Sequence, residues 1–480
     1  MIRRQHIFPL PVLPGLVLLM LCTPFRGSGQ TGSTSPATGA QNPFLGSVPT
    51  GQPTAEPLPL SLKDAFERAL RYNLGVIESD QATRAARAAR LHSLNALLPD
   101  LTARVSSTIE QINLAALGFT GTNLPGFHIP TIIEPFSVAD ARAYLSQEVF
   151  NWSDIKNLKS ASESEKASQY TYKNDRDLVV LTTADAYLVV VSDAATVDST
   201  RAQVNTAQAL YQRTSDQHKS GVAAAIDELR SQVELQTQQQ RLIAAENALA
   251  IDKLTLARVI GLPNGQEFQL TDAVPYAPLA AMSLDESLQQ AYVRRSDYLS
   301  AKEQVRAAEL TAQAAAAENY PSVSVNTDYG DIGSPNFSSS HGTVTFQASL
   351  NIPIFQGTRV RADKLQADSA LRQRQAELEN LRGNVDAQVR TAFLNLKSSS
   401  DLVAVAKSNT DLAHQTLAQS QDRFSSGVAD NLEVVQAQES VASAEQSYIA
   451  SVYSYNLAKV SLAQAMGIAE QSALTYLGGK

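Results

Sequence analysis

Long segments without proline are separated along the chain by short stretches in which apolar and polar residues alternate. Residues 152–218 and 358–424 contain no proline, and each is soon followed by a glycine, Gly221 or Gly427. A helix of about 65 residues is on the order of 100 Å long. Shorter segments without proline follow at 224–260 and 430–466. The pattern predicts two hairpins, each made of a long helix and a shorter return helix.

The two return segments share an apolar ladder with a spacing of seven residues, which is typical of coiled-coil packing. In the first segment the ladder consists of Leu235, Leu242, Leu249 and Leu256. Adding 206, the offset between the two glycines (427 − 221), leads to Val441, Tyr448, Tyr455 and Leu462. Glycines and packing positions therefore repeat together, and the chain contains two copies of one module.

The front parts of the two copies match at a different offset. Ser61 corresponds to Ser283 and Pro99 to Pro321, at 222 (283 − 61), so the first copy has 16 additional residues (222 − 206). They are expected between Pro99 and Phe150, where residues 115–135 are rich in glycine, proline and asparagine, as in a surface loop. The copies are predicted at 60–263 and 282–467, and each begins with a pair of helices that ends at a proline.

After each proline the period of the pattern changes from helical to two. Val344, Phe346, Ala348 and Leu350 alternate with polar residues, and similar alternation predicts strands at about 100–111, 138–150, 322–330 and 343–353. Strands of this length suit a transmembrane β-barrel, but a soluble sheet packed on helices has the same alternation. Four strands are too few to close a barrel, so the membrane interpretation requires several chains.

Composition narrows the class of function. The 480 residues are 44% hydrophobic and 6% aromatic, with a net charge of −8 and a pI near 5.4. This acidic balance, without clusters of lysine and arginine, argues against a nucleic-acid partner. The chain has no nucleotide-binding glycine loop, no hydrolase nucleophile motif and no zinc motif. We therefore predict no enzyme, no catalytic residue, no metal and no cofactor.

The N-terminus has the features of a secretory signal peptide at 1–29. Arg3 and Arg4 precede the apolar run 16–21, which is too short to span a bilayer. Residues 30–58 are predicted to be a flexible linker, and 468–480 a C-terminal tail. Cys22 is the only cysteine and the only candidate for lipidation. Leu21 stands where a lipoprotein box has a small residue, so we favour removal of Cys22 with the signal peptide.

Several motifs occur in both copies and in the same order. A residue pair ending in proline precedes the first strand, at Leu98–Pro99 and Tyr320–Pro321. The second strand turns into the long helix at 145–151 and 350–357, and the helix tips read Lys219–Val222 and Ser425–Val428. In this duplicated order, between about Leu60 and Gly467, the chain resembles the TolC-type outer-membrane efflux proteins, also called outer-membrane factors.

The resemblance implies a homotrimer in outer-membrane lipid. Four strands from each chain would form a 12-stranded barrel, continued by an α-helical barrel through the periplasm. The chain would be a passive exit duct of a tripartite efflux or type I secretion system, with a periplasmic adaptor (membrane fusion) protein and an inner-membrane pump of the RND, ABC or MFS type. The alternative from another class is a periplasmic coiled-coil scaffold or adaptor without a barrel; the four alternating strands argue against it.

The resemblance also suggests functional residues at the hairpin tips. Adaptor docking would involve Gly221, Val222, Gly427 and Val428, although glycine is also a common end of a helix. The family's periplasmic constriction commonly has two acidic residues, which here correspond to Glu433 and Gln436, so one carboxylate is missing. Three copies of Glu433 would form an anionic ring that favours cations, with Asp430 contributing to its charge. A solvated helix face explains Glu433 equally well.

Overall fold

The computed structural model describes residues 42–118, 123–124, 127–128, 130–280, 282–334 and 339–478. The predicted signal peptide, Cys22 and the first part of the predicted linker lie outside the described residues. All described residues belong to the unit that begins at Asn42.

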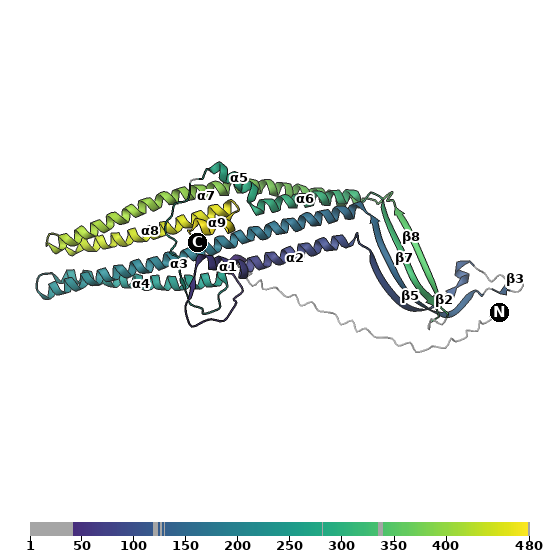
Figure 1. The fold of residues 1–480 in the computed structure, drawn as a ribbon, viewed down its shortest axis with the longest axis horizontal. Coiled ribbons are helices and arrows are strands. Elements are labelled where there is room, and N and C mark those ends of the chain that lie inside the picture. The colour runs from purple at the N-terminus through teal and green to yellow at the C-terminus, as the bar shows by residue number, and fades with distance from the viewer. Residues whose placement is uncertain are drawn as a thin grey trace, which may run out of the picture. The chain divides into compact units, whose positions relative to one another are not determined.

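Each half of this unit contains two short helices, two strands and two long helices in the same order (Figure 1). The first half consists of α1 (Leu62–Tyr72), α2 (Leu74–Asn95), β2 (Asp100–Asn113), β5 (Ile132–Phe150), α3 (Trp152–Lys219) and α4 (Ala225–Ile260). The second consists of α5 (Leu284–Arg294), α6 (Ser296–Ala317), β7 (Ser322–Gly333), β8 (His341–Asn351), α7 (Arg359–Ser425) and α8 (Asn431–Ala465). The predicted fold class, mainly helical with a small β part and a duplicated module, is confirmed.

The first helix of each half starts at the same kind of N-cap. The Ser61 hydroxyl accepts a hydrogen bond from the Asp64 N–H at 3.1 Å, and the Asp64 carboxylate accepts one from the Ser61 N–H at 3.2 Å. Ser283 and Glu286 form the same reciprocal pair. This capping box satisfies backbone donors that the first turn of a helix leaves free. It gives a physical reason for the sequence match between Ser61 and Ser283.

The longest helices are α3 and α7, with 68 and 67 residues, and each is on the order of 100 Å long at 1.5 Å per residue. The Asn151 side chain caps α3 by accepting hydrogen bonds from the N–H groups of Ser153 and Asp154. Among the helices of the described residues, α3 alone is long and apolar enough to cross a membrane. Val180 and Tyr187 of α3 are buried in the core, so packing within the chain accounts for their apolar character.

The four long strands form one antiparallel sheet in the order β2, β5, β7, β8. One row across it consists of Leu101, Leu145, Thr327 and Phe346. β5 begins at Ile132 and β2 continues to Asn113, beyond the predicted strands. The additional residues of the first copy lie in these extensions and in the connection between β2 and β5, which contains a short helix, η2 (Leu114–Leu117), and the short strands β3 (Asn123–Leu124) and β4 (Phe127–His128).

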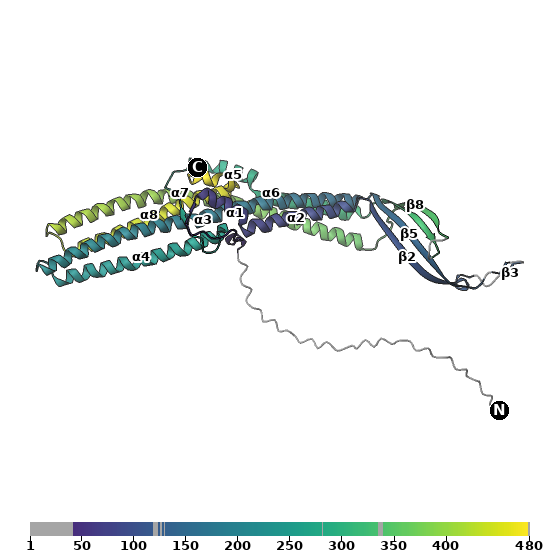
Figure 2. The ribbon, with the colours of Figure 1, turned by 60° about the horizontal axis from the view of Figure 1, so that its bottom comes forward.

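The elements line up as four columns along this unit (Figures 1 and 2). Next to the sheet, α2 packs on α3, α3 on α6, and α6 on α7. Toward the hairpin tips the succession becomes α4, α3, α8 and α7, because α4 takes the place of α2 and α8 that of α6. The columns are therefore β2–α2–α4, β5–α3, β7–α6–α8 and β8–α7. The first and last columns are the edges.

The main hydrophobic core lies where the two halves meet, around the middle of α3 and the ends of α4 and α8. Tyr187, Leu256, Ile260, Leu462 and Met466 are all buried there. Two of these belong to the predicted ladders, and Leu235, Val441 and Tyr455 of the same ladders are buried as well. The spacing of seven thus predicts core positions on both return helices.

The segments beyond the two copies also pack on this core. Residues 43–45 form a short helix, η1 (Pro43–Leu45), whose Phe44 contacts the core, and the Val48 N–H donates to the Tyr72 carbonyl at 2.9 Å. Strand β1 (Leu58–Leu60) pairs in parallel with β6 (Phe268–Leu270). The predicted C-terminal tail contains a helix, α9 (Ala469–Tyr476), that buries Ala469 and Ala473. These contacts offset the entropy cost of ordering both segments, which composition alone does not predict.

Candidate functional site

Both helical hairpins turn at a glycine in the left-handed conformation. Gly221 has a φ of 75° and Gly427 a φ of 73°. In both turns the next N–H donates back into the long helix, from Val222 to the Gln217 carbonyl and from Val428 to the Arg423 carbonyl, each at 2.9 Å. A side chain at this φ is strained, so glycine suits the turn even though the space around both glycines is open.

The two tips lie at the same end of the helices (Figure 1), and each exposes a valine. Val222 and Val428 are 78% and 69% exposed. The structure therefore brings the four residues predicted for docking, Gly221, Val222, Gly427 and Val428, to the exposed ends of the hairpins. Exposed apolar residues at a tip, with no obstruction around the glycines, form a surface that a partner helix can approach.

A carboxylate joins the two helices of the second hairpin close to its tip. Glu433 of α8 accepts a hydrogen bond from Arg423 Nε at 3.0 Å and one from the Ser420 hydroxyl at 3.3 Å, both on α7. Asp430 is the N-cap of α8, and its side chain accepts from the Glu433 N–H at 3.2 Å. Gln436 is exposed one turn further along. The three residues predicted for the constriction thus lie at the start of α8, and the charge of Glu433 has a partner within the chain.

In the first hairpin a carboxylate also joins the two helices, and we call each of these sets of contacts a clamp. The match between the two copies in sequence does not predict this one. Glu228 of α4 accepts from the Ser215 hydroxyl at 2.8 Å and lies 2.5 Å from His218 Nδ1, both on α3. These two hydrogen bonds hold the pKa of Glu228 below its usual range. At the offset of 206 Glu433 corresponds to Asp227 rather than Glu228, so the glycine register conceals the equivalence.

Polar contacts also join the two hairpins to each other. The Asn431 amide on α8 donates to the Asp227 carbonyl at 3.0 Å, and Arg241 of α4 forms an ion pair with Glu439 of α8 at 3.1 Å. Further from the tip on α8, Glu445 accepts hydrogen bonds from Ser199 and Gln203 of α3 and lies 3.0 Å from His414 Nε2 of α7. In each contact the two partners lie on different helices, and most are about 200 residues or more apart in sequence. No local motif therefore predicts these contacts.

Between these contacts the four helices line a cavity of about 130 Å³. It is lined by side chains of α3, α4, α7 and α8, among them Gln238, Gln438 and Glu234. The Gln238 Oε1 atom and both polar atoms of the Gln438 amide are buried without a hydrogen-bond partner. Burial raises the pKa of Glu234. A cavity with such partners accommodates ordered water. Within the described ranges no three histidine, cysteine or acidic side chains form a group that could hold a metal ion.

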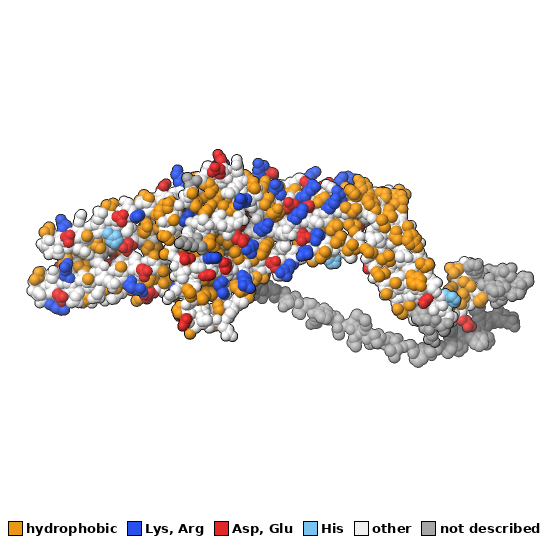
Figure 3. All heavy atoms as spheres, viewed as in Figure 1, with side chains coloured by type: hydrophobic (Ala, Val, Ile, Leu, Met, Phe, Trp, Pro, Cys, Tyr) orange, Lys and Arg blue, Asp and Glu red, His pale blue; other side chains and the backbone are white. Residues whose placement is uncertain are grey.

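The two faces of the sheet differ in polarity. One face carries exposed apolar residues on all four strands, including Val105, Tyr329, Val344 and Phe346, and Figure 3 shows hydrophobic side chains gathered over this region. On the other face, Arg142 of β5 binds Asp140 at 2.5 Å and Asp328 of β7 at 3.0 Å. An apolar face that no described residue covers indicates an apolar environment.

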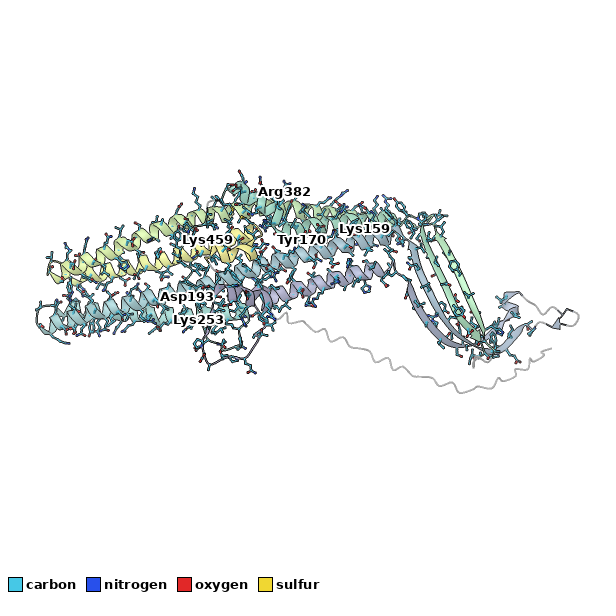
Figure 4. All side chains as sticks on the ribbon, in the orientation of Figure 1. Lys159, Tyr170, Asp193, Lys253, Arg382 and Lys459 are labelled. Atoms are coloured by element: carbon cyan, nitrogen blue, oxygen red, sulfur yellow. The ribbon has the colours of Figure 1, made fainter. Side chains whose placement is uncertain are left out.

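Two ionisable groups with a shifted pKa lie on the helices away from the tips and the sheet, and of these Lys459 is buried and Asp193 half-buried (Figure 4). Lys459 of α8 is fully buried, and its Nζ donates to the Ala277 carbonyl at 3.3 Å. Burial lowers its pKa to about 8. Burial and the neighbouring Asp252 of α4 raise the pKa of Asp193 on α3 to about 6. Lys459 thus contacts the connection that contains Ala277, and Asp193 faces the neighbouring helix α4.

Comparison with known proteins places this arrangement among membrane channels. The family model described as outer membrane efflux protein matches residues 65–262 and 287–468. The chain is 27% identical over 325 residues to the probable efflux pump outer membrane protein TtgC of Pseudomonas putida, and the match spans 64% of each chain. It is 23% identical over 356 residues to the outer membrane protein TolC of Escherichia coli, a match covering 71% of this chain and 72% of TolC.

A solved structure shows that the likeness extends to the fold. The open state of the Neisseria gonorrhoeae MtrE outer membrane channel superposes with a TM-score of 0.72 and covers 85% of this chain and 89% of that one. The sequence identity between the two is 17%, so this likeness concerns the fold alone.

Proposed function

Because the chain belongs to the outer membrane efflux protein family, we propose that it is the outer-membrane exit duct of a tripartite efflux or type I secretion system. Members of this family are outer-membrane channels. The predicted N-terminal signal peptide would direct the chain through the inner membrane, and the helices would extend from the outer membrane into the periplasm. The match spans only 64% of the TtgC chain, so we base the proposal on this chain's own geometry as well.

The observation that carries the proposal is the sheet with one uncovered apolar face and two open edges. An open edge in lipid leaves backbone groups unpaired at several kcal/mol each, so β2 and β8 must pair with other chains. Three copies would contribute 3 × 4 strands to a 12-stranded barrel, with Phe346 toward lipid and Arg142 toward the water-filled lumen. A homotrimer is the partner arrangement that we propose.

The helical part supplies the passage through the periplasm and the docking surface. An adaptor protein would bind at the exposed tips around Gly221, Val222, Gly427 and Val428, and an RND, ABC or MFS pump in the inner membrane would supply the energy. Transport through the chain itself would be passive. Three copies of Glu433, together with Asp430 and Gln436, would line the constriction at the tip and favour cations.

The sheet argues against the alternative function, a periplasmic scaffold without a barrel. A scaffold exposed only to water has no reason to expose Val105, Val344 and Phe346 on one face of a sheet. Its open edges would also be prone to aggregation in the periplasm.

The proposal is tested by the conductance of the detergent-extracted protein in a planar bilayer. Stable pores, together with an outer-membrane location and an oligomer that dissociates on heating, support the duct. A monomer recovered in the soluble periplasmic fraction would contradict it. The matched variant for the proposed constriction is Glu433→Gln. If its pores keep the cation selectivity of the unmodified protein, the duct stands and Glu433 does not line the constriction.

A further inference from the structure

A pocket of about 210 Å³ lies between α3, α8 and the connection that leads from β6 to α5. Most of its wall is apolar, and the lining residues include Leu188, Val191, Val274, Pro275, Ile449 and Val452. Both helices belong to the two inner columns. Among the described residues, none of the edge helices α4 and α7 lines the pocket, so it lies apart from the edges of the layer.

The size and the wall of the pocket suit one small aromatic ring. In another protein an apolar cavity of about 150 Å³ stays dry and binds benzene. At about 210 Å³ this pocket has room for a benzene ring with small substituents. The rings of Tyr276, Tyr448 and Tyr453 form part of the wall, and aromatic side chains favour offset or edge-on contacts with another ring.

One polar atom in the wall of the pocket lacks a partner. Asn456 of α8 is 1% exposed, and its Oδ1 atom is buried without a hydrogen bond. A buried acceptor that is left unpaired is unfavourable. The hydroxyl of Tyr453, one turn earlier on α8, instead donates to Asp185 Oδ1 at 2.6 Å. A ligand with an O–H or N–H group near Asn456 would supply the missing donor.

The same asparagine holds the connection that forms one wall of the pocket. Its Nδ2 atom donates to the Val274 carbonyl at 3.1 Å. Val274 has a φ of 39°, and within the described ranges no other residue except glycine has a positive φ. A valine in this conformation is strained, because its branched side chain crowds the backbone. One turn further on α8, Lys459 Nζ donates to the Ala277 carbonyl at 3.3 Å. The wall is therefore fixed before a ligand enters, and binding does not have to order it.

We propose that this pocket binds a small aromatic molecule with one hydrogen-bond donor, such as a phenol, whose donor pairs with Asn456 Oδ1. The ring would contact α3, α8 and the connection at the same time. The inference is independent of the proposed duct, because every lining residue belongs to one chain. For a ligand with about eight heavy atoms we expect a Kd on the order of 1 mM.

Two fluorinated ligands of similar size test the pocket and its acceptor separately. para-Fluorophenol has an O–H donor, whereas para-difluorobenzene has a fluorine in its place and cannot donate. Binding to the full-length, detergent-extracted protein is followed by fluorine NMR, with the detergent alone as the background. We expect para-fluorophenol to bind roughly tenfold more tightly, because only this ligand satisfies Asn456 Oδ1.

Three variants locate the ligand. Ser192 of α3 also lines the pocket, and Ser192→Phe should weaken both ligands roughly tenfold by filling the space. The control is Ser162→Phe, which adds the same ring to another half-buried serine of α3, 30 residues away (192 − 162) or about 45 Å, and should change neither affinity. Asn456→Leu removes the acceptor with little change in volume and should lower the affinity for para-fluorophenol to that for para-difluorobenzene. Circular dichroism shows whether each variant is folded.

The outcomes separate the location of the ligand from the role of the acceptor. Binding that a folded Ser192→Phe variant leaves unchanged would overturn the location. Equal affinities of the two ligands for the unmodified protein would overturn the role of Asn456, and this comparison needs no variant. No binding of either ligand above the detergent background would overturn the proposal as a whole. The duct is tested by pore formation and does not depend on any of these results.

Discussion

Arg423 Nε lies 3.0 Å from Glu433 Oε1, so a guanidinium on α7 partly neutralises the carboxylate that we propose for the constriction. Both side chains are partly exposed, and an ion pair of this kind contributes little to stability. In the proposed constriction a passing ion would sense the summed charge of the two side chains.

We predict that the two partners affect ion selectivity in opposite directions. Arg423→Gln removes the cation and should increase cation selectivity, whereas Glu433→Gln should decrease it. The double variant has the formal charge of the unmodified pair and should return close to the original selectivity. Reversal potentials in a salt gradient measure this. Arg372→Gln, which removes the same charge from α7 far from the tip, is the control. An identical change in all variants would exclude Glu433 from the constriction.

Substitutions at Gly427 separate the shape of the tip from its backbone conformation. At a φ of 73° any side chain costs about 1–2 kcal/mol, but a Cβ meets nothing within 4 Å. We therefore expect Gly427→Ala to retain adaptor binding and Gly427→Trp to lose most of it by steric exclusion. Co-purification of the adaptor with the assembled protein is the measurement. Gly383→Trp on α7, also in open space, is the control. Equal binding by the Ala and Trp variants would contradict docking at this tip.

The repeated architecture follows from local physics, which explains why it was predictable. The glycines at 221 and 427 are needed for the turns, and Ser61 and Ser283 for the helix starts, so these positions persist in both copies. The strands alternate because one face of the sheet is apolar. Each feature depends on residues a few positions apart, and the sequence pattern therefore locates it.

The contacts between distant segments were not predictable in this way. The sequence did not predict the role of Glu228, because the clamp in the first hairpin lies one residue further from its glycine than the clamp in the second. Arg241 and Glu439 are 198 residues apart and meet only because α4 touches α8. Helix α9 has no repeated counterpart, and its burial depends on the core around Met466. In each case the partner is chosen by tertiary packing rather than by spacing.

Replacing Lys459 should stabilise the protein below about pH 8. Its pKa is lowered from the ordinary value of 10.5 to about 8 in the folded chain, so the folded state binds fewer protons between these values and stability rises with pH there. Below pH 8 the unmodified chain carries the full cost of the buried charge. Lys459→Met should remove roughly 2–3 kcal/mol of that cost. Thermal unfolding followed by circular dichroism should show a benefit at pH 7 that shrinks toward pH 10.5; a benefit independent of pH would argue against a charged Lys459.

Asp193 should show the opposite pH dependence. Its pKa is raised from 3.8 to about 6, so the folded state binds more protons and stability falls as pH rises between these values. Solvent screens this half-buried carboxylate, so Asp193→Asn should stabilise the chain by only about 1–2 kcal/mol above pH 6 and have no effect below pH 4. Unfolding midpoints at pH 4 and pH 8 measure the difference. Asp198→Asn, at a position on the same helix whose side chain is 82% exposed, should change neither midpoint.

Neighbouring residues of β8 provide the most direct test of the membrane face. Phe346 lies on the apolar face beside Thr327, and Gln347 lies on the polar face beside Asn326. An arginine that faces lipid at the bilayer midplane costs about 2–4 kcal/mol, and three copies would carry that cost together. Phe346→Arg should therefore reduce insertion and assembly strongly, whereas Gln347→Arg should assemble normally because its charge would face water.

The measurement for this pair is the amount of heat-dissociable oligomer in the outer-membrane fraction, compared with the total amount of protein. Both variants add the same charge to adjacent positions of one strand, so a general effect on synthesis or export would lower both equally. Normal assembly of both variants would mean that Phe346 does not face lipid. Loss of assembly in Gln347→Arg alone would place the two faces of the sheet the other way round, with the polar residues outward.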